Sequence, residues 1–135
     1  MARNGSDDAL RRSTARVDAV EGLLAYAATR SARAALREVS RAVSMSREIV
    51  AERPEHTSLL VRALIVEAGL HLRRRRPADA LPVAEESVAL ARREGGAPLA
   101  RSLIALAAAY EALQRYSEAA EASAEASRVM EHDER

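Results

Sequence analysis

The stretch Leu103-Ile-Ala-Leu-Ala-Ala-Ala-Tyr110, continued by Tyr116-Ser-Glu-Ala119 and Ala126, decides the fold of this 135-residue chain. Its Tyr110 is followed after nine residues by Ala119, and after seven more by Ala126. The same nine-then-seven spacing occurs in two earlier segments, Tyr26–Ala35–Ala42 and His71–Ala80–Ser87. A spacing held three times along one chain is typical of stacked pairs of helices. The sequence therefore predicts an all-α fold of three stacked antiparallel helix pairs.

The composition agrees with an all-α domain of ordinary size. Hydrophobic residues make up 48% of the chain, yet Phe, Trp and Cys are absent and only three Tyr are present. Ala, Leu, Glu and Arg, which favour helices, are spread throughout. The formal net charge is only +1, which gives no overall attraction to nucleic acid or to an anionic membrane. Without Cys there is no disulfide, thiolate metal site or Cys nucleophile.

The chain shows no feature of export or membrane insertion. Its first eight residues lack the apolar core of a signal peptide. The longest apolar stretch, Leu103–Tyr110, is too short to cross a bilayer. We therefore expect a cytoplasmic protein.

Turn residues divide the chain into six predicted helices. We expect a flexible N-terminus at 1–7, a helical domain at 8–131 with repeats at about 16–52, 55–94 and 98–131, and a tail at 132–135. The predicted helices begin near Asp8, Ala32, Pro54, Asp79, Pro98 and Tyr116. In this prediction Asp79 caps the fourth helix and Pro82 lies in its first turn, where a missing N–H costs little. Gly95 and Gly96 end that helix.

The third repeat, Leu103-x-x-Leu106-Ala107-x-x-Tyr110 followed by Tyr116-x-Glu118-Ala119 and Ala126, resembles the tetratricopeptide consensus. The second resembles it more loosely, and the first keeps its three marker residues. Equivalent residues of successive repeats are 45 and 39 positions apart, which exceeds the usual tetratricopeptide period of about 34. In this long period the chain resembles a bacterial, especially actinobacterial, branch of the superfamily. In place of the usual large aromatic in each second helix stand Val39, Ala84 and Ser123.

The resemblance implies that a peptide or a partner helix binds along the concave face formed by the first helix of each pair. Helical geometry places that groove on the side turned away from the partner helix of each pair. The predicted groove residues are Val17, Val20, Leu24, Arg62, Ile65, Leu72, Arg101, Ile104 and Glu111. Arg62 and Arg101 occupy matching places and could hold a carboxylate bidentately. The alternative, which we favour, is that both Arg residues only solvate an exposed face.

The first helix is apolar on a second face as well, formed by Ala19, Leu23 and Tyr26. A helix that is apolar on both sides is usually covered on both sides. Either the array curls to cover this face or a second chain covers it, and we favour a partner or a second copy of the chain.

No pattern of catalytic or metal-binding residues is present. Arg73-Arg-Arg-Arg76 is favoured as a solvated turn that complements a helix C-terminus, because stacking aromatics for nucleic acid are lacking. His71 replaces Tyr of the other repeats, which favours a packed, hydrogen-bonded histidine. His56 and His132 stand alone, so no zinc site is expected.

The sequence thus favours a non-catalytic scaffold that binds another protein or a peptide and needs no cofactor or metal. The alternatives are a homo-oligomerising helical domain and the interaction or sensor part of a bacterial regulator. Neither nucleic acid nor a membrane is an expected partner.

Overall fold

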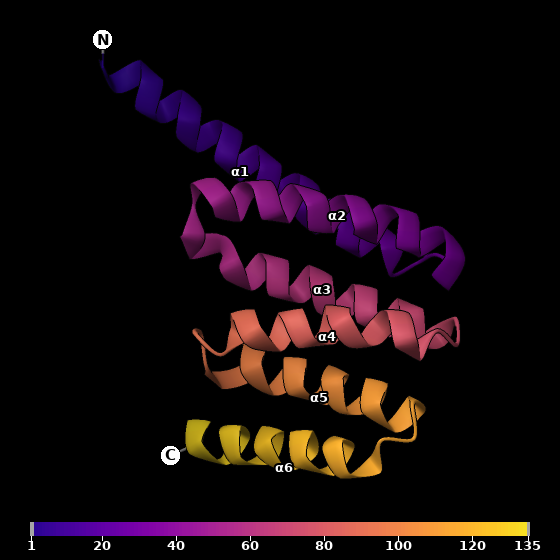
Figure 1. Ribbon diagram of the computed structural model, residues 1–135. Coiled ribbons are helices and arrows are strands. Elements are labelled where there is room, and N and C mark those ends of the chain that lie inside the picture. Colours follow the sequence, from indigo (N-terminus) through magenta and orange to yellow (C-terminus); the bar gives the residue numbers. More distant parts are fainter. Residues whose placement is uncertain (1, 135) are drawn as a thin grey trace.

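The computed structural model describes residues 2–134, and within that range it contains helices and no strands (Figure 1). The six α-helices are α1 (Ala2–Ala27), α2 (Ala32–Glu52), α3 (Thr57–Arg73), α4 (Pro77–Ala91), α5 (Gly96–Ala112) and α6 (Tyr116–Asp133). A single 3-10 turn, η1 (Pro54–His56), precedes α3. The predicted all-α class is confirmed.

The helices are stacked in chain order. Each helix packs against the next one, from α1 against α2 to α5 against α6 (Figure 1). Short turns join successive helices, which therefore run antiparallel. The first helices of the pairs also meet: α3 packs against α5, whereas α1 touches α3 at a few residues only. The chain thus forms three consecutive helix pairs.

The small residues of the nine-then-seven pattern lie at the contacts between helices. All six are buried, namely Ala35, Ala42, Ala80, Ser87, Ala119 and Ala126. Small side chains let two helix backbones approach closely, which explains why the spacing is kept. The aromatic members of the pattern behave differently. Tyr26 is 48% exposed and lies under the guanidinium of Arg30, 4.9 Å from its ring centroid.

Larger side chains form two apolar clusters. The first joins α1, α2 and α3 around Val20, Val39, Ile49 and Leu64. The second joins α3 to the last three helices around Val61, Val88, Leu99 and Leu103. Because α3 contributes to both clusters, it links the first pair to the rest of the stack.

Helix ends differ from the sequence-based expectation at several places. α3 begins at Thr57, because Pro54–His56 forms the 3-10 turn η1 before it, and α4 already ends at Ala91, four residues before Gly95. α1 begins at Ala2 and not at Asp8, since extending an existing helix costs little per residue. α4 begins at Pro77, whose fixed φ suits the first helical position, so Pro82 falls inside the helix and not in its first turn. α5 begins at Gly96, two residues before Pro98.

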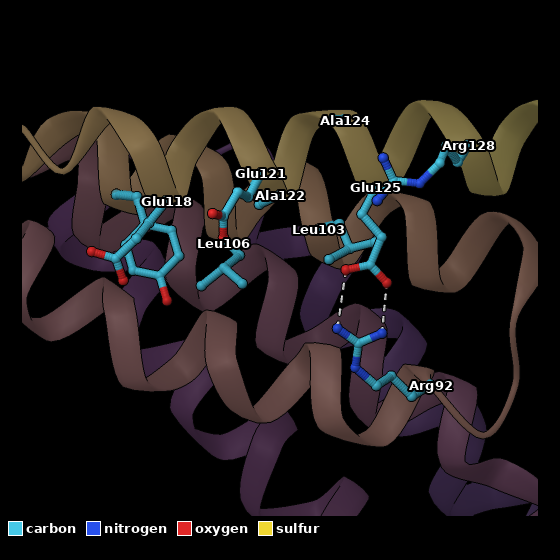
Figure 2. A pocket seen from close by; sticks show the side chains of 10 residues that line it. Arg92, Leu103, Leu106, Glu118, Glu121, Ala122, Ala124, Glu125 and Arg128 are labelled. Carbon is cyan, nitrogen blue, oxygen red and sulfur yellow. Dashed lines mark hydrogen bonds and ion pairs between the residues drawn. The ribbon is translucent and has the colours of Figure 1, made fainter.

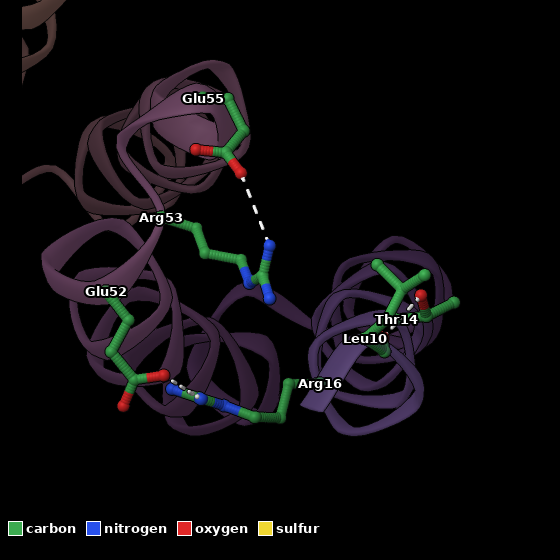
Figure 3. A network of polar contacts seen from close by, with 6 residues as sticks. All are labelled: Leu10, Thr14, Arg16, Glu52, Arg53 and Glu55. Atoms are coloured by element: carbon green, nitrogen blue, oxygen red, sulfur yellow. Dashed lines mark hydrogen bonds and ion pairs between the residues drawn. The ribbon is translucent and has the colours of Figure 1, made fainter. Parts of the chain in front are cut away.

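Ion pairs secure the connection of the first pair to η1 (Figure 3). Arg16 of α1 donates to Glu52 at the end of α2, with an N–O distance of 2.8 Å. Arg53, which follows α2, lies 3.7 Å from Glu55. These groups are mostly exposed, so each pair contributes at most about 1 kcal/mol.

Candidate binding groove

The first helices of the three pairs enclose a shallow hollow of about 210 Å³. Leu24 of α1, Ile65 and Val66 of α3 form its apolar floor. Arg62 of α3 and Arg101 of α5 stand on its rim, and both are exposed. We call the side of the molecule formed by α1, α3 and α5 the first-helix face.

Four of the predicted groove residues, Leu24, Arg62, Ile65 and Arg101, therefore lie together around one hollow. Three others lie on α3 and α5 outside it. Ile104 is 53% exposed, Glu111 is exposed and Leu72 is partly buried.

The prediction for α1 is wrong in part. Val20 is fully buried, and Leu24 is only 8% exposed. Val17 packs against the same apolar cluster. This side of α1 belongs to the core because α2 and α3 cover it. Of the second apolar face predicted for α1, Ala19 and Tyr26 are exposed, whereas Leu23 is partly buried and packs against the same cluster.

Arg62 already has a carboxylate partner within the chain. It donates two hydrogen bonds to Glu21 of α1, at 2.7 and 2.9 Å. These bonds lower the pKa of the Glu21 carboxyl and raise that of the guanidinium. Arg62 is thus engaged by a carboxylate of its own chain, which distinguishes it from Arg101. The sequence offered a signal for Glu21, because it lies on the same helical side as Val17 and Leu24.

Arg101 is the cation of the hollow without such a partner. Within the described residues no carboxylate lies in ion-pair distance of it. Its counterpart Arg62 meets Glu21, whereas Arg101 lines the hollow beside Ile65 and Val66 of α3. The rim of the hollow therefore has one positive charge in excess.

A second hollow of about 450 Å³ lies between α5, α6 and the end of α4 (Figure 2). Leu103, Leu106 and Tyr110 contribute apolar surface to it. Arg92 donates two hydrogen bonds to Glu125 across this space, at 2.6 and 3.1 Å. These bonds lower the pKa of Glu125. Because this pair spans the hollow, it ties α6 to the end of α4.

A similar pair connects the second helices of the first two repeats. Arg47 of α2 binds Glu86 of α4 bidentately, with one N–O distance of 2.8 Å, and lowers the pKa of Glu86. Beside it, burial raises the pKa of Glu67. The Nε2 atom of His71 lies 3.8 Å from Glu67. His71 is packed as expected, but its buried Nδ1 has no hydrogen-bond partner among the described residues.

The Arg73–Arg76 run forms the turn between α3 and α4. Arg75 has a φ of 59°, and its N–H donates to the carbonyl of Leu72 at 2.9 Å. The run thus occupies a helix C-terminus, as expected for cations that complement the helix dipole. Within residues 2–134 no three His, Asp or Glu side chains are grouped as a metal site. No helix in that range is long and apolar enough to span a bilayer.

Comparison with known proteins finds no matching family model, no matching curated protein and no matching solved structure.

Proposed function

We propose that this chain is a non-catalytic interaction scaffold whose first-helix face binds a helical segment of another protein. The observation that carries the proposal is the hollow with the apolar floor of Leu24, Ile65 and Val66 below the charge of Arg101. An apolar pocket with one convergent charged group is a common form of recognition site. Grooves between helices commonly receive the apolar face of an amphipathic helix.

The chemistry of the surface favours an acidic amphipathic helix as the ligand. One aliphatic side chain of the ligand enters the hollow, and a carboxylate one turn away meets Arg101. A guanidinium binds a carboxylate through two parallel hydrogen bonds, which fixes orientation as well as affinity. Ile104, one turn after Arg101 on α5 and 53% exposed, extends the apolar contact along the face.

We also propose membership of the tetratricopeptide superfamily. The stacked helix pairs and the buried small residues at Ala80, Ser87, Ala119 and Ala126 support it. The function fits such a repeat, in which the first helices line the binding surface. The setting that goes with this resemblance is the interaction or sensor part of a bacterial regulator.

Charge reversal tests the proposal. The chain with Arg101→Glu is compared with the wild type and with Arg37→Glu as affinity baits in lysate of the native cell. Arg37 is a matched control because it is exposed on α2 and, like Arg101 on α5, is the sixth residue of its helix. We expect Arg101→Glu to lose proteins that both other baits retain. An identical set of bound proteins for all three baits would reject this placement of the site.

A further inference from the structure

One end of the stack concentrates positive charge. The three turns that join the helices within each pair, 28–31, 74–76 and 113–115, lie at the same end of the molecule, at the right of Figure 1. These turns and the helical turns beside them carry seven arginines, namely Arg30, Arg33, Arg73, Arg74, Arg75, Arg76 and Arg115. We call this set the basic end. Arg74 is partly buried, and its other members are exposed.

Few carboxylates balance this charge. Within one helical turn of the same three turns, the acidic residues are Asp79, Glu111 and Glu118. Arg115 binds Glu118, whereas no other member of the basic end belongs to an ion pair within residues 2–134. The turns and helix ends at the opposite end carry more acid than base, namely Glu52, Glu55, Glu94, Glu131, Asp133 and Glu134 against Arg53, Arg92 and Arg93. Positive charge is thus concentrated at one end, although the formal net charge is only +1.

At the first of these turns the arginines surround a hollow. Arg30, Arg33 and Arg37 line about 280 Å³ of space at the start of α2, together with Glu38. The carboxylate of Glu38 lies 3.8 Å from Arg41, so it does not neutralise these three groups fully. A guanidinium binds a phosphate through two parallel hydrogen bonds. The hollow therefore fits a phosphate group.

All three tyrosines of the chain stand at the basic end. Tyr26 lies in the last turn of α1, Tyr110 lies in that of α5, and Tyr116 opens α6. Tyr26 and Tyr116 are exposed by 48% and 63%. Arg30 lies over the ring of Tyr26, 4.9 Å from its centroid, and Arg115 lies 4.8 Å from that of Tyr110. Exposed rings among arginines are the combination on which the bases of a single strand stack.

We propose that the basic end binds single-stranded nucleic acid, with its arginines on the phosphates and with Tyr26 and Tyr116 on the bases. In a duplex the bases stack on one another, so a ring at the protein surface reaches the faces of unpaired bases only. An acidic protein segment would use the arginines and leave the rings without a role. An anionic membrane needs apolar side chains that insert beside the charges, whereas these turns offer small and polar ones such as Ser31 and Gln114.

This inference departs from the expectation drawn from the sequence. Arg73–Arg76 alone favoured a solvated turn, because aromatic residues are few and the run is short. The structure brings Arg30, Arg33 and the tyrosines to the same end as the run, which gives the wide footprint that the chain order does not show. Arg101 of the first-helix face lies in the half of α5 nearer the opposite end, so the inference is independent of the proposed function.

Fluorescence anisotropy with a short labelled oligothymidylate tests the inference, and a labelled duplex of the same length is the comparison. Non-specific binding of this kind has a dissociation constant of about 1–100 μM at physiological salt. With roughly four to six phosphates contacted, the constant should rise about 50- to 300-fold between about 50 and 200 mM salt. We expect the single strand to bind more tightly than the duplex.

Two pairs of substitutions with the same change in net charge locate the site. Arg73→Gln with Arg76→Gln removes two charges from the basic end, and Arg93→Gln with Arg128→Gln removes two from elsewhere. All four arginines are exposed, and none belongs to an ion pair within the described residues. The first variant should weaken binding at low salt by at least about tenfold and flatten its salt dependence, and the second should change little. Equal losses for both variants would overturn the proposal.

The role of the rings is tested at Tyr116. Tyr116→Ala should weaken binding of the single strand by at least about fivefold, whereas Tyr116→Phe should keep it and binding of the duplex should not change. Circular dichroism checks that each variant keeps its helices. Absence of binding to the oligothymidylate at low salt, or a duplex bound as tightly as the single strand, would overturn the proposal. Binding of a polyglutamate peptide or of phosphatidylserine vesicles without binding of the oligothymidylate would also overturn it and assign the basic end to that partner.

Discussion

Three buried serines make a sharp prediction about stability. Ser46, Ser87 and Ser102 are all fully buried within helices. The Oγ of Ser46 donates to the carbonyl of Ala42 at 2.7 Å, and that of Ser87 to Ala84 at 2.9 Å. The Oγ of Ser102 has no hydrogen-bond partner among the described residues. Replacement by Ala should therefore have opposite consequences at these positions.

The expected change in the free energy of unfolding follows from the hydrogen bond of each hydroxyl and from the difference in helix propensity between Ser and Ala. A buried hydroxyl without a partner costs about 1–3 kcal/mol, and Ala favours a helix over Ser by about 0.5 kcal/mol. Filling the position with a methyl group leaves almost no cavity. Ser102→Ala is thus expected to raise the free energy of unfolding by about 1–2 kcal/mol. At Ser46 and Ser87 a lost hydrogen bond of about 1 kcal/mol offsets the propensity gain, so Ala is neutral or slightly destabilising.

Chemical denaturation followed by circular dichroism measures these differences. For a domain of this size 1 kcal/mol corresponds to about 3–5 °C in Tm, so thermal melts give a second reading. The comparison among three serine-to-alanine changes cancels their shared effect on helix propensity. If Ser102→Ala were as neutral or as destabilising as Ser46→Ala and Ser87→Ala, the assignment of an unpartnered hydroxyl would be refuted.

Four further changes test other parts of the fold. Ala80→Leu puts a large side chain into a fully buried helix contact and should destabilise by at least about 1–3 kcal/mol in denaturant melts; an unchanged midpoint would contradict close packing there. Gly95 has φ 69° and ψ −165°, a region open to glycine almost alone, so Gly95→Ala should cost about 1–3 kcal/mol, against little loss for Ala at exposed Ser40. Arg47 lowers the pKa of the Glu86 carboxyl, so Glu86 contributes stability at pH values above its unfolded pKa near 4.5, and this stability is lost as pH falls through the folded pKa. In Glu86→Gln the free energy of unfolding should therefore depend less on pH in this acidic range. Burial raises the pKa of the Glu67 carboxyl, so the stability that this group contributes is present below pH 4.5 and is lost as pH rises through the folded pKa. Glu67→Gln should therefore raise the free energy of unfolding at pH 7. A lower free energy of unfolding at that pH would contradict the buried placement of Glu67.

The sequence predicted the helix pairs because their signal is repeated. The spacing of Ala35, Ala80 and Ala119 is set by helix contacts that recur in each pair, and it needs no knowledge of neighbouring side chains. Single residues at helix ends were harder to predict. Pro77 and Pro82 each suit a first turn, and the choice between them depends on the turn that precedes α4.

The candidate site could be predicted only in part. Offsets within a repeat assigned Arg62, Ile65 and Arg101 to one face, and these residues line one hollow because they lie on equivalent sides of α3 and α5. The same offsets assigned Val20 of α1 to the groove, but the structure buries this residue completely. This helix is the first of the stack, and an amphipathic pattern does not tell which side its neighbours cover. The Glu21–Arg62 pair also escaped prediction, since it depends on how α1 lies relative to α3.

The central claim, that the first-helix face is the interaction surface, is tested most directly by site-specific photo-crosslinking in the native cell. A benzophenone amino acid replaces Ile104 in one variant and Ala89 in another; Ile104 is exposed on the first-helix face, and Ala89 is exposed on α4. Our account predicts crosslinks from position 104 and few from position 89. It also predicts that the captured segments are acidic and amphipathic. Equal crosslinking at both positions, or capture only at position 89, would contradict it.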